Sequence, residues 1–451
     1  MKINLQNKKV LVLGLGETGH SALRWLENHG AILSVADSRK NPPNVDDLVQ
    51  KMPQVDVYTG PFNADLLLKF QLIVISPGIS LQEPAVQAAM NAGIPVIGDV
   101  ELFAQHQPAG TKVIGITGAN GKTTVTTLVG EMCKAAGLKV VVAGNIGLPV
   151  LDALTLPKPD IYVLELSSFQ LETTHTLKLD VATLLNISED HMDRYEDMEA
   201  YIAAKARIFE YAKVRVLNRD DRVSMRFNNK DAVTFGLNEA PNKDDFGVKT
   251  CEGNLCLTSG QRKLTLAKEL KIAGLHNVSN GLAALAICAS IGLERTPVLS
   301  ALKTFKGLPH RVEWVANIDE VDFYDDSKGT NVGATCAALA GLPQKAVLIA
   351  GGDGKDQDFS PLAAAVIANA RAVVVFGRDA DKIEAVLLAT NFPIYDAIDL
   401  REAVAIAHKV ALPGDAVLLS PACASFDMFK NYIHRAEVFI DAVHALEVAV
   451  C

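Results

Sequence analysis

The chain has 451 residues, of which 49% are hydrophobic and 21% are charged, and it carries a formal net charge of -9 with a pI of about 5.6. This length predicts more than one domain, and the composition is that of a globular protein, because disordered chains combine low hydrophobicity with high net charge. The acidic balance argues against nucleic acid or an anionic membrane as the main partner, but it leaves local basic pockets open.

The seven cysteines are scattered and include no CxxC pair. This pattern predicts neither a disulfide framework nor a zinc site, and it fits a reducing compartment. Residues 1–9 have no apolar segment that would direct export, and no uncharged run reaches the roughly 20 apolar residues that span a bilayer. We therefore expect a cytoplasmic protein without membrane insertion.

The first hundred residues alternate between short β-branched runs and segments of helical period. Strands are expected at 10–13, 32–36 and 72–76, and a helix at 20–29. This rhythm predicts a parallel sheet with crossover helices.

A larger unit follows, in which a strand at 113–117 leads into a helix at 122–136. Further strands are expected at 140–143, 161–166 and 181–186, and helices at 277–291 and 297–305. Between residues 246 and 272 short alternating segments are separated by the turn signals Gly253-Asn254 and Ser259-Gly260, which predict a small antiparallel extension.

The last part returns to alternation of strands and helices. Strands are expected at 346–350, 372–376 and 416–419, and helices at 361–370, 380–389, 400–410 and 427–446. We predict an α/β protein of three domains, at 1–100, 101–307 and 308–451, with breaks near 99–111 and 306–309. The first and third are expected to be Rossmann-like, and the central one a P-loop ATPase-type domain. Because each is expected to be doubly wound, ligands should bind outside the carboxyl ends of its strands.

A glycine-rich loop, TGANGKTT at 117–124, lies between the strand and the helix that open the central domain. Backbone N–H groups and the helix dipole favour a polyphosphate at such a place. Lys122 would bridge the β- and γ-phosphates, and Thr123 would offer its hydroxyl to Mg²⁺. The usual pattern has glycine where Ile116 stands. The loop nevertheless predicts ATP binding.

A second glycine-rich turn, GLGETG at 14–19, follows the first strand, and Asp37 follows the second. This spacing meets the dinucleotide-binding fingerprint and would by itself indicate an NAD-dependent oxidoreductase. The same geometry can hold any nucleotide diphosphate or be purely structural, so the residues leave its ligand open.

Three further segments of the central domain carry candidate ligands. Glu165 ends an apolar strand, where a carboxylate can face metal and phosphate. Residues 186–194 gather acids around His191, as either a solvated turn or a metal site. Lys205 lies among alanines on a predicted helix, and from the residues alone it is expected at the surface.

Three cationic turns occur towards the carboxyl end: GLPHR at 307–311, DDSKGTN at 325–331 and GGDGK at 351–355. Each could be a hydrophilic turn. Together, in an acidic protein and next to predicted strands, they indicate a site for anionic ligands.

In their order along the chain, these motifs resemble the Mur ligase family, the ATP-dependent amide-forming enzymes of bacterial peptidoglycan precursor synthesis. The resemblance covers essentially the whole chain and rests on the runs TGANGKTT, LELSSFQLE, NISEDHMDRY, GLHNVSN, GLPHR, DDSKGTN, GGDGKD and SPACASFD. The runs are most similar to members that join D-glutamate to UDP-N-acetylmuramoyl-L-alanine. The resemblance implies a first domain that binds the UDP-sugar, a central ATPase domain, and a third domain that swings in with the amino acid.

The resemblance also implies roles for individual residues. Lys122, His191 and Lys205 would be catalytic. One Mg²⁺ would be held by Thr123 and Glu165, and a second by His191 and Lys205, which is carbamylated in the family. ATP would contact Gly118, Asn120, Gly121, Lys122, Thr123, Thr124, Asn277, Asn280, Arg311, Asp326 and Lys328. The UDP-sugar would contact Glu17, Thr18, Ser38, Arg39, Gly78 and Asn145, and D-glutamate would contact Thr330, Lys355, Ser425 and Tyr432.

Small departures from the family pattern concern Ala119, Asp325 and Gly329, where threonine, asparagine and alanine are common. Tyr432 stands where phenylalanine is usual, and Phe426 where leucine is common. The last two affect the shape expected of the amino-acid pocket.

Three alternatives remain open at the level of sequence. An NAD-dependent oxidoreductase would leave the loop at Lys122 unexplained. A folylpolyglutamate synthetase would share the central loop but has no need of the first hundred residues. A non-catalytic nucleotide-binding module would bind ATP without turnover. For the ligase that the motifs resemble, we expect a monomer.

Overall fold

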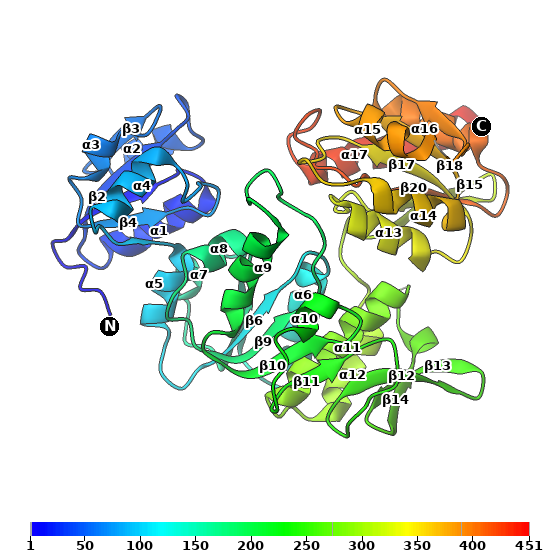
Figure 1. Cartoon of the computed structure of the whole chain (residues 1–451), viewed down its shortest axis with the longest axis horizontal. Coiled ribbons are helices and arrows are strands. Elements are labelled where there is room, and N and C mark those ends of the chain that lie inside the picture. Colours follow the sequence, from blue (N-terminus) through cyan, green and yellow to red (C-terminus); the bar gives the residue numbers. More distant parts are fainter. Residues whose placement is uncertain (1, 273, 389, 451) are drawn as a thin grey trace.

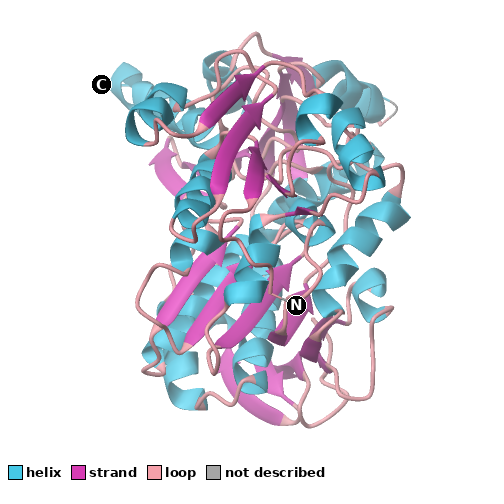
Figure 2. Cartoon of the chain, turned by 90° about the vertical axis from the view of Figure 1, so that its left-hand side faces the viewer, coloured by secondary structure: helices cyan, strands magenta, loops and turns pink. Residues whose placement is uncertain are grey.

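The computed structural model describes residues 2–272, 274–388 and 390–450. Within these residues the strands form three sheets, and each sheet belongs to one continuous part of the chain. Figure 1 shows the first unit in blue and the third in yellow to red, both above the central unit in cyan and green. Figure 2 shows helices packed around the strands of these units.

The first unit has a five-stranded parallel sheet in the order β3-β2-β1-β4-β5. Its strands are β1 (Lys9–Leu13), β2 (Ile32–Asp37), β3 (Asp56–Thr59), β4 (Leu72–Ile75) and β5 (Val96–Ile97), and its helices are α1 (Glu17–Glu27), α2 (Val45–Lys51), α3 (Ala64–Leu67) and α4 (Pro84–Asn91). Strands β1 and β4 are almost wholly apolar and buried, as a sheet covered on both faces requires. Because the strand order reverses between them, a crevice opens beyond their carboxyl ends.

The central unit has a nine-stranded sheet in the order β14-β13-β12-β11-β10-β9-β6-β8-β7. Its strands are β6 (Lys112–Thr117), β7 (Val140–Gly144), β8 (Ile161–Glu165), β9 (Leu179–Leu184), β10 (Ala212–Asn218), β11 (Val233–Phe235), β12 (Phe246–Cys251), β13 (Asn254–Ser259) and β14 (Arg262–Leu266). The strands from β7 to β12 pair in parallel, whereas β12, β13 and β14 pair antiparallel, which confirms the predicted extension.

The helices of the central unit cover this sheet and connect it to the first unit. They are α5 (Asp99–His106), α6 (Lys122–Ala135), α7 (Val150–Ala153), α8 (Ser168–Glu172), α9 (Met198–Ala206), α10 (Arg222–Met225), α11 (Leu275–Ser290) and α12 (Arg295–Thr304), with short 3-10 helices at Arg207–Phe209 and Ala267–Glu269. The predicted break at 99–111 thus begins with a helix, α5, whose apolar side joins a core shared by the first and central units.

The third unit has a six-stranded sheet in the order β15-β16-β20-β17-β18-β19, parallel except for the pair β15–β16. The strands are β15 (Glu313–Ile318), β16 (Val321–Asp325), β17 (Ala346–Gly351), β18 (Ala370–Phe376), β19 (Ile394–Asp396) and β20 (Ala416–Leu419), and the helices are α13 (Val332–Gly341), α14 (Ser360–Asn369), α15 (Ala380–Leu388), α16 (Leu400–Val410) and α17 (Tyr432–Val450). Alternate residues of β17 enter two different cores, so both faces of the sheet are covered.

The predicted α/β fold is confirmed, but several boundaries differ. Helix α1 begins at Glu17 and not at His20, because glycine 16 supplies the extended residue before it. Helix α17 begins at Tyr432, five residues after the predicted start at Asp427, since residues 427–431 form turns. The strand predicted at 181–186 is Leu179–Leu184. The end predicted for α15, residue 389, lies outside the described residues.

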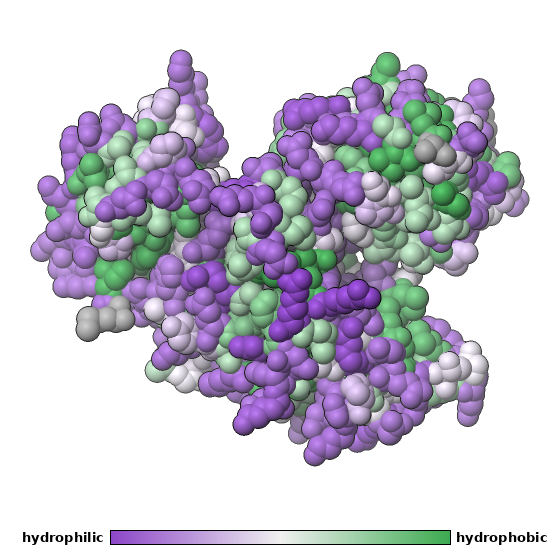
Figure 3. Space-filling view, in the orientation of Figure 1, coloured by the Kyte–Doolittle hydropathy of each residue, from purple (hydrophilic) through white to green (hydrophobic). Residues whose placement is uncertain are grey.

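The molecular surface in Figure 3 is mostly hydrophilic and is hollowed between the first and third units, above the central unit. Among the described residues, none of the helices combines the length and the apolar character that crossing a membrane requires.

Candidate active site

The loop between β6 and α6 is fixed from behind by Asn186, just after β9. The N–H of Ala119 donates to the Asn186 carbonyl at 2.9 Å, and the N–H of Asn120 donates to the Asn186 side-chain oxygen at 2.8 Å. Gly121 has a φ of 82°, and a Cβ there would lie 2.5 Å from Oδ1 of Asn280. Only glycine fits at this position, both sterically and conformationally. The loop therefore has a defined shape in front of the helix N-terminus.

Two lysines reach the same loop from different helices. Lys122 Nζ donates to the carbonyls of Gly118 and Ala119 at 2.8 and 2.7 Å, and Lys205 Nζ donates to the carbonyl of Gly118 at 3.0 Å. Burial lowers the pKa of Lys122. Burial, followed by the charge of Lys122, lowers the pKa of Lys205 to well below its ordinary range.

The surface position expected for Lys205 from the residues alone is wrong. Its side chain is buried and lies 4.7 Å from the ring centroid of Tyr201, one turn earlier on α9. Tyr201, Ile202 and Ala204 share the buried part of this helix, which packs on α8. The alanines of α9 mark no clear apolar stripe in the sequence, so the buried face was not visible there.

At the end of β8, Glu165 is buried with one oxygen satisfied. Its Oε1 accepts a hydrogen bond from Asn145 Nδ2 at 2.9 Å, and its Oε2 has no hydrogen-bond partner among the described residues. Asn145 follows β7, the neighbouring strand. A buried carboxylate oxygen without a donor is costly unless a cation or ligand occupies the site.

His191 and Asp190 face the same cleft from the segment after β9. Burial, together with the charges of Lys355, Lys205 and Lys122, outweighs Asp190 and lowers the pKa of His191 to about 4, so its imidazole is neutral at pH 7. Asp190 Oδ1 receives Lys355 Nζ at 2.6 Å, and the pKa of this carboxyl is lowered by Lys355 and His191 despite its burial. Because Lys355 belongs to the third unit, this ion pair joins two units across the cleft.

These groups line one central cleft between the central and third units. It contains the predicted catalytic and metal-binding residues Lys122, Thr123, Glu165, His191 and Lys205, together with the predicted D-glutamate residues Thr330, Lys355, Ser425 and Tyr432. Phe426, 73% exposed, lines the same cleft. The structure thus brings together residues that lie more than 300 positions apart in sequence.

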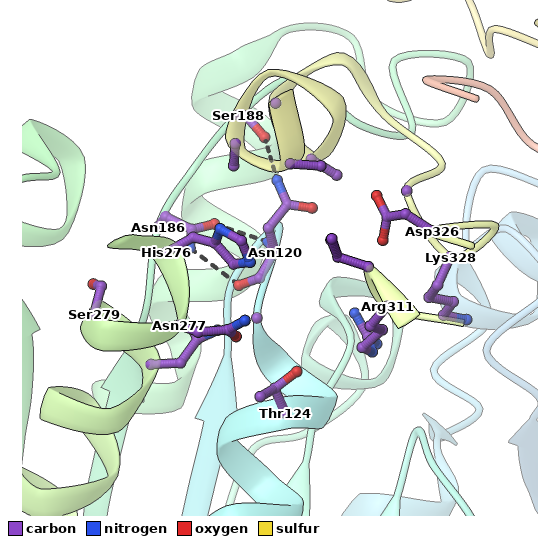
Figure 4. Close-up of a pocket in the computed structure, with 18 of the residues that line it drawn as sticks. Asn120, Thr124, Asn186, Ser188, His276, Asn277, Ser279, Arg311, Asp326 and Lys328 are labelled. Carbon is purple, nitrogen blue, oxygen red and sulfur yellow. Dashed lines mark hydrogen bonds between the residues drawn. The ribbon is translucent and has the colours of Figure 1, made fainter. Parts of the chain in front are cut away.

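A second cleft lies behind the loop, between α6, α11 and the start of the third unit (Figure 4). It is lined by Asn120, Gly121, Thr124, Asn277, Asn280, Arg311, Asp326 and Lys328, all predicted to contact ATP. Burial lowers the pKa of Arg311 and, together with Arg311, lowers the pKa of Lys328 to about 8, whereas burial raises the pKa of Asp326 to about 7. In Figure 4 Asp326, Lys328 and Arg311 lie on the side opposite Asn186 and His276.

A third cleft lies between the first and central units, beyond the carboxyl ends of β1 and β4. All six residues predicted to contact the UDP-sugar line it: Glu17, Thr18, Ser38, Arg39, Gly78 and Asn145. Asn145 also lines the central cleft, so the two clefts meet there.

Asp37, the acidic residue of the dinucleotide fingerprint, is occupied by its own chain. Its carboxylate accepts the N–H of Leu15 at 2.7 Å and pairs with Arg39 at 2.6 Å, and the hydrogen bond from Arg39 lowers its pKa to about 2. The residue fixes the glycine-rich turn and holds a guanidinium at the cleft. The arrangement favours an anionic ligand over the ribose contact that an NAD site would use.

Comparison with known proteins identifies the whole chain. Residues 8–98 match the Mur ligase MurD-like N-terminal domain, residues 116–288 the Mur ligase middle domain, and residues 310–423 the glutamate ligase domain of Mur ligases. A UDP-N-acetylmuramoylalanine–D-glutamate ligase from Methylobacillus flagellatus is 59% identical over 99% of this chain and 98% of its own length. One from Thiobacillus denitrificans is 55% identical over 98% of each chain. The chain belongs to the Mur ligase family.

Solved structures of Mur ligases share the three-unit fold at low sequence identity. UDP-N-acetylmuramate–alanine ligase from Thermotoga maritima has a TM-score of 0.60 at 20% identity, covering 97% of this chain and 100% of that one. MurF from Acinetobacter baumannii has a TM-score of 0.61 at 16% identity, covering 97% and 91%. These likenesses confirm the predicted fold.

One predicted residue of this Mur ligase is set back from the clefts. Gly118 is buried behind the loop residues that follow it. Its carbonyl accepts hydrogen bonds from Lys122 and Lys205. Residues missed by sequence reasoning are Asp190, the partner of Lys355, and Asn186, which holds the phosphate loop. The run NISEDH directly after β9 carried the signal for both, since it follows a strand adjacent to β6.

Proposed function

We propose that this Mur ligase joins D-glutamate to UDP-N-acetylmuramoyl-L-alanine and converts ATP to ADP and phosphate. The observation that carries the proposal is that the three clefts meet. The central cleft shares Asn145 with the cleft between the first and central units. It shares Asn120 and Gly121 with the second cleft, behind the loop, which we call the nucleotide cleft. The names of the two relatives, at 59% and 55% identity over nearly the full length, supply the substrates. Such enzymes act in the cytoplasm on peptidoglycan precursors.

The three clefts support a main substrate for each part of the chain. Residues 1–100 would bind the UDP-sugar together with Asn145 of the central unit, and residues 308–451 would bring the amino acid. Residues 101–307 would bind ATP together with the start of the third unit. Arg39 and the turn at 14–19 hold the UDP diphosphate, and Asn277, Asn280, Arg311, Asp326 and Lys328 hold the nucleotide. The protein acts as a monomer, since each substrate finds its contacts within one chain.

The residues around Glu165 fit a magnesium ion. A buried carboxylate oxygen without a donor, next to the hydroxyl-bearing Thr123 that follows the loop lysine, is the hard-oxygen donor set that Mg²⁺ prefers. His191 is neutral and therefore able to ligate a second ion. Bound Mg²⁺ neutralises negative charge on the phosphoryl group in transfer.

Lys205 is suited to carry a carbamate. Its lowered pKa raises the fraction of free amine, the form whose lone pair attacks CO₂. The ammonium first loses one proton to give this amine; the attack then forms an N–C bond, opens one C=O π bond of CO₂ and releases a second proton, so that a cation is replaced by an anionic oxygen ligand. This change would place a carboxylate-like group next to His191, completing the second metal site.

The reaction follows from the arrangement of the cleft. A carboxylate is a poor acylating agent because its oxygen is a poor leaving group, so the γ-phosphoryl of ATP is first transferred to the carboxylate of the bound alanine. Lys122, at the loop, stabilises the charge on the transferring group. D-glutamate is held by Lys355, Thr330 and Ser425. Its amine then attacks the acyl phosphate and expels phosphate. Approach of the third unit shields the acyl phosphate from water.

The deciding assay is phosphate release from ATP with UDP-N-acetylmuramoyl-L-alanine, compared across D-glutamate, L-glutamate, meso-diaminopimelate and L-lysine. Of the four amino acids, we expect only D-glutamate to support phosphate release. Lys122→Ala should abolish ADP release while the far-UV spectrum is unchanged. Equal turnover with another amino acid, or full activity of the variant, would contradict the proposal.

A further inference from the structure

Helix α13 of the third unit lies against the nucleotide-binding edge of the central unit at both of its ends. It directly follows the loop 325–331, which contributes Asp326 and Lys328 to the nucleotide cleft and Thr330 to the central cleft. The position of α13 therefore determines where these three side chains lie in the clefts. Of the residues that fix α13, only Asn120 also belongs to the predicted ATP contacts.

At its N-terminus, α13 is tied to the phosphate loop by a reciprocal pair of amides. Asn120 Nδ2 donates to Asn331 Oδ1 at 3.2 Å, and Asn331 Nδ2 donates to Asn120 Oδ1 at 3.1 Å. Asn331 also caps α13 by accepting the N–H of Ala334 at 2.9 Å. Gly333 approaches so closely that a Cβ there would lie 2.9 Å from Ser188 Oγ.

At its C-terminus, α13 meets His276, which stands in the first turn of α11 and lines the nucleotide cleft. A Cβ on Gly341, the last residue of α13, would lie 2.9 Å from Cε1 and 3.0 Å from Nδ1 of this imidazole. A Cβ on Gly274 would lie 2.8 Å from Cε1, so the ring is held between two glycines. Ala337, also in α13, lines the same cleft as the ring.

We propose that His276 is a positioning residue whose ring seats the end of α13 on the central unit and thereby places the loop 325–331 over the clefts. Gly333 and Gly341 are eight residues apart, about 12 Å along the helix axis, so the two contacts fix the direction of the helix as well as its distance. This inference rests on the proposed function only for its kinetic readout.

Gly341 offers a sharp test, because its backbone does not have a positive φ. A methyl group there is therefore excluded by the His276 ring and not by the backbone conformation. Gly341→Ala should push the ring and the helix apart, and His276→Ala should remove the ring. In the double variant the methyl group has room, so the second substitution should add nothing.

The experiment measures the KM of all three substrates for wild type, His276→Ala, Gly341→Ala and the double variant. Each single substitution should raise the KM values for D-glutamate and ATP together, because the loop 325–331 carries contacts to both clefts. The expected rise is about fivefold or more, the range of ordinary coupling between sites, and the KM for the UDP-sugar should stay unchanged. The double variant should match His276→Ala. Ala340→Ser, at the exposed neighbouring residue of the same helix, is the matched control and should behave as wild type.

Three outcomes would overturn the inference: effects of the two substitutions that multiply, a rise in the KM for ATP alone, or a lowered melting temperature with no change in any KM. The second would make His276 a direct nucleotide ligand, and the third a purely structural residue. Solution scattering gives an independent readout, since both single variants should have a larger radius of gyration than wild type with a bound ATP analogue. If wild type itself lacked D-glutamate-dependent turnover, the proposed function would fail while the scattering comparison would still test the seat of α13.

Discussion

Lys122 and Lys205 donate to one carbonyl, that of Gly118, at 2.8 and 3.0 Å. Two ammonium groups at such short range repel each other strongly in a buried site. The repulsion is relieved when Lys205 is neutral or converted to a carbamate, and its lowered pKa expresses the same preference. The electrostatics of the site thus favour a Lys205 without positive charge, either as the free amine or as the proposed carbamate.

Lys205→Ala tests this account. The substitution should reduce turnover by about 100-fold or more, since removal of even the outer-shell partners of metal ligands typically costs about 10- to 100-fold. Added short carboxylic acids should restore part of the activity by supplying the missing oxygen ligand. Wild type should in addition lose activity when CO₂ and bicarbonate are removed from the buffer. An active variant, or one that no carboxylic acid rescues, would argue against the carbamate.

If Lys328 holds ATP as proposed, we expect the binding of ATP to depend on pH. Burial and Arg311 lower its pKa to about 8, and its ammonium lies 3.8 Å from the ring centroid of Tyr432. As the pH rises through about 8, the side chain loses the proton that attracts phosphate, so kcat/KM for ATP should fall on the alkaline side. Lys328→Arg keeps its charge and should move the fall to higher pH. Lys345→Arg, at an exposed lysine of the same unit, should leave the profile unchanged, and an identical profile for all three proteins would exclude Lys328 as the titrating group.

At the scale of elements, α17 fixes two loops of the third unit through one buried guanidinium. Arg435 Nη2 donates to the carbonyl of Ser327 at 2.8 Å, Nε donates to Ser327 Oγ at 3.0 Å, and Nη1 donates to the carbonyl of Cys423 at 3.1 Å. Ser327 stands between Asp326 and Lys328, and Cys423 precedes Ser425. The helix therefore supports the loops that carry the proposed ATP and D-glutamate contacts.

Arg435→Ala should destabilise the third unit by about 3 kcal/mol or more, since it leaves buried acceptors without donors and opens a cavity. Arg435→Lys can satisfy one acceptor, so its free energy of unfolding should lie between those of Arg435→Ala and wild type. Urea unfolding followed by tryptophan fluorescence measures the loss, because Trp314 lies in β15 of the same unit. An unchanged midpoint for Arg435→Ala would show that the loops are held by other contacts.

The elements that sequence predicted well are those whose side chains repeat a simple pattern. The buried strands β1, β6, β8 and β17 are short apolar runs, and α16 has a clear amphipathic period. The missed elements lack such a signal. In β15 several residues are exposed, so no apolar run marks the strand, and α13 consists mainly of small residues. The motif loops predicted most of the polar residues that line the clefts. The burial of Lys205 and the pair Asp190–Lys355 depend on tertiary contacts that no local pattern encodes.

At the scale of the whole molecule, the three units are not equally independent. One apolar core runs from the first sheet through α5 and α7 to a face of the central sheet and includes Trp25, Phe103 and Tyr162. In the described residues, both cores of the third unit are made only of its own side chains. Its connections to the central unit include polar contacts such as Lys355–Asp190 and Asn331–Asn120.

This difference predicts how the chain comes apart. A fragment of residues 308–451 should fold alone and unfold cooperatively, because both of its hydrophobic cores are internal. A fragment of residues 1–98 should be much less stable than the same unit in the full chain, because it exposes the face of α1 that packs on α7. Extending it to residue 107 adds α5 but not α7, and should restore only part of the stability. Urea unfolding of the three fragments, compared with the full chain, measures their relative stabilities. A disordered fragment 308–451 together with a stable fragment 1–98 would contradict the prediction, because the first unit would then not depend on the core that it shares with the central unit.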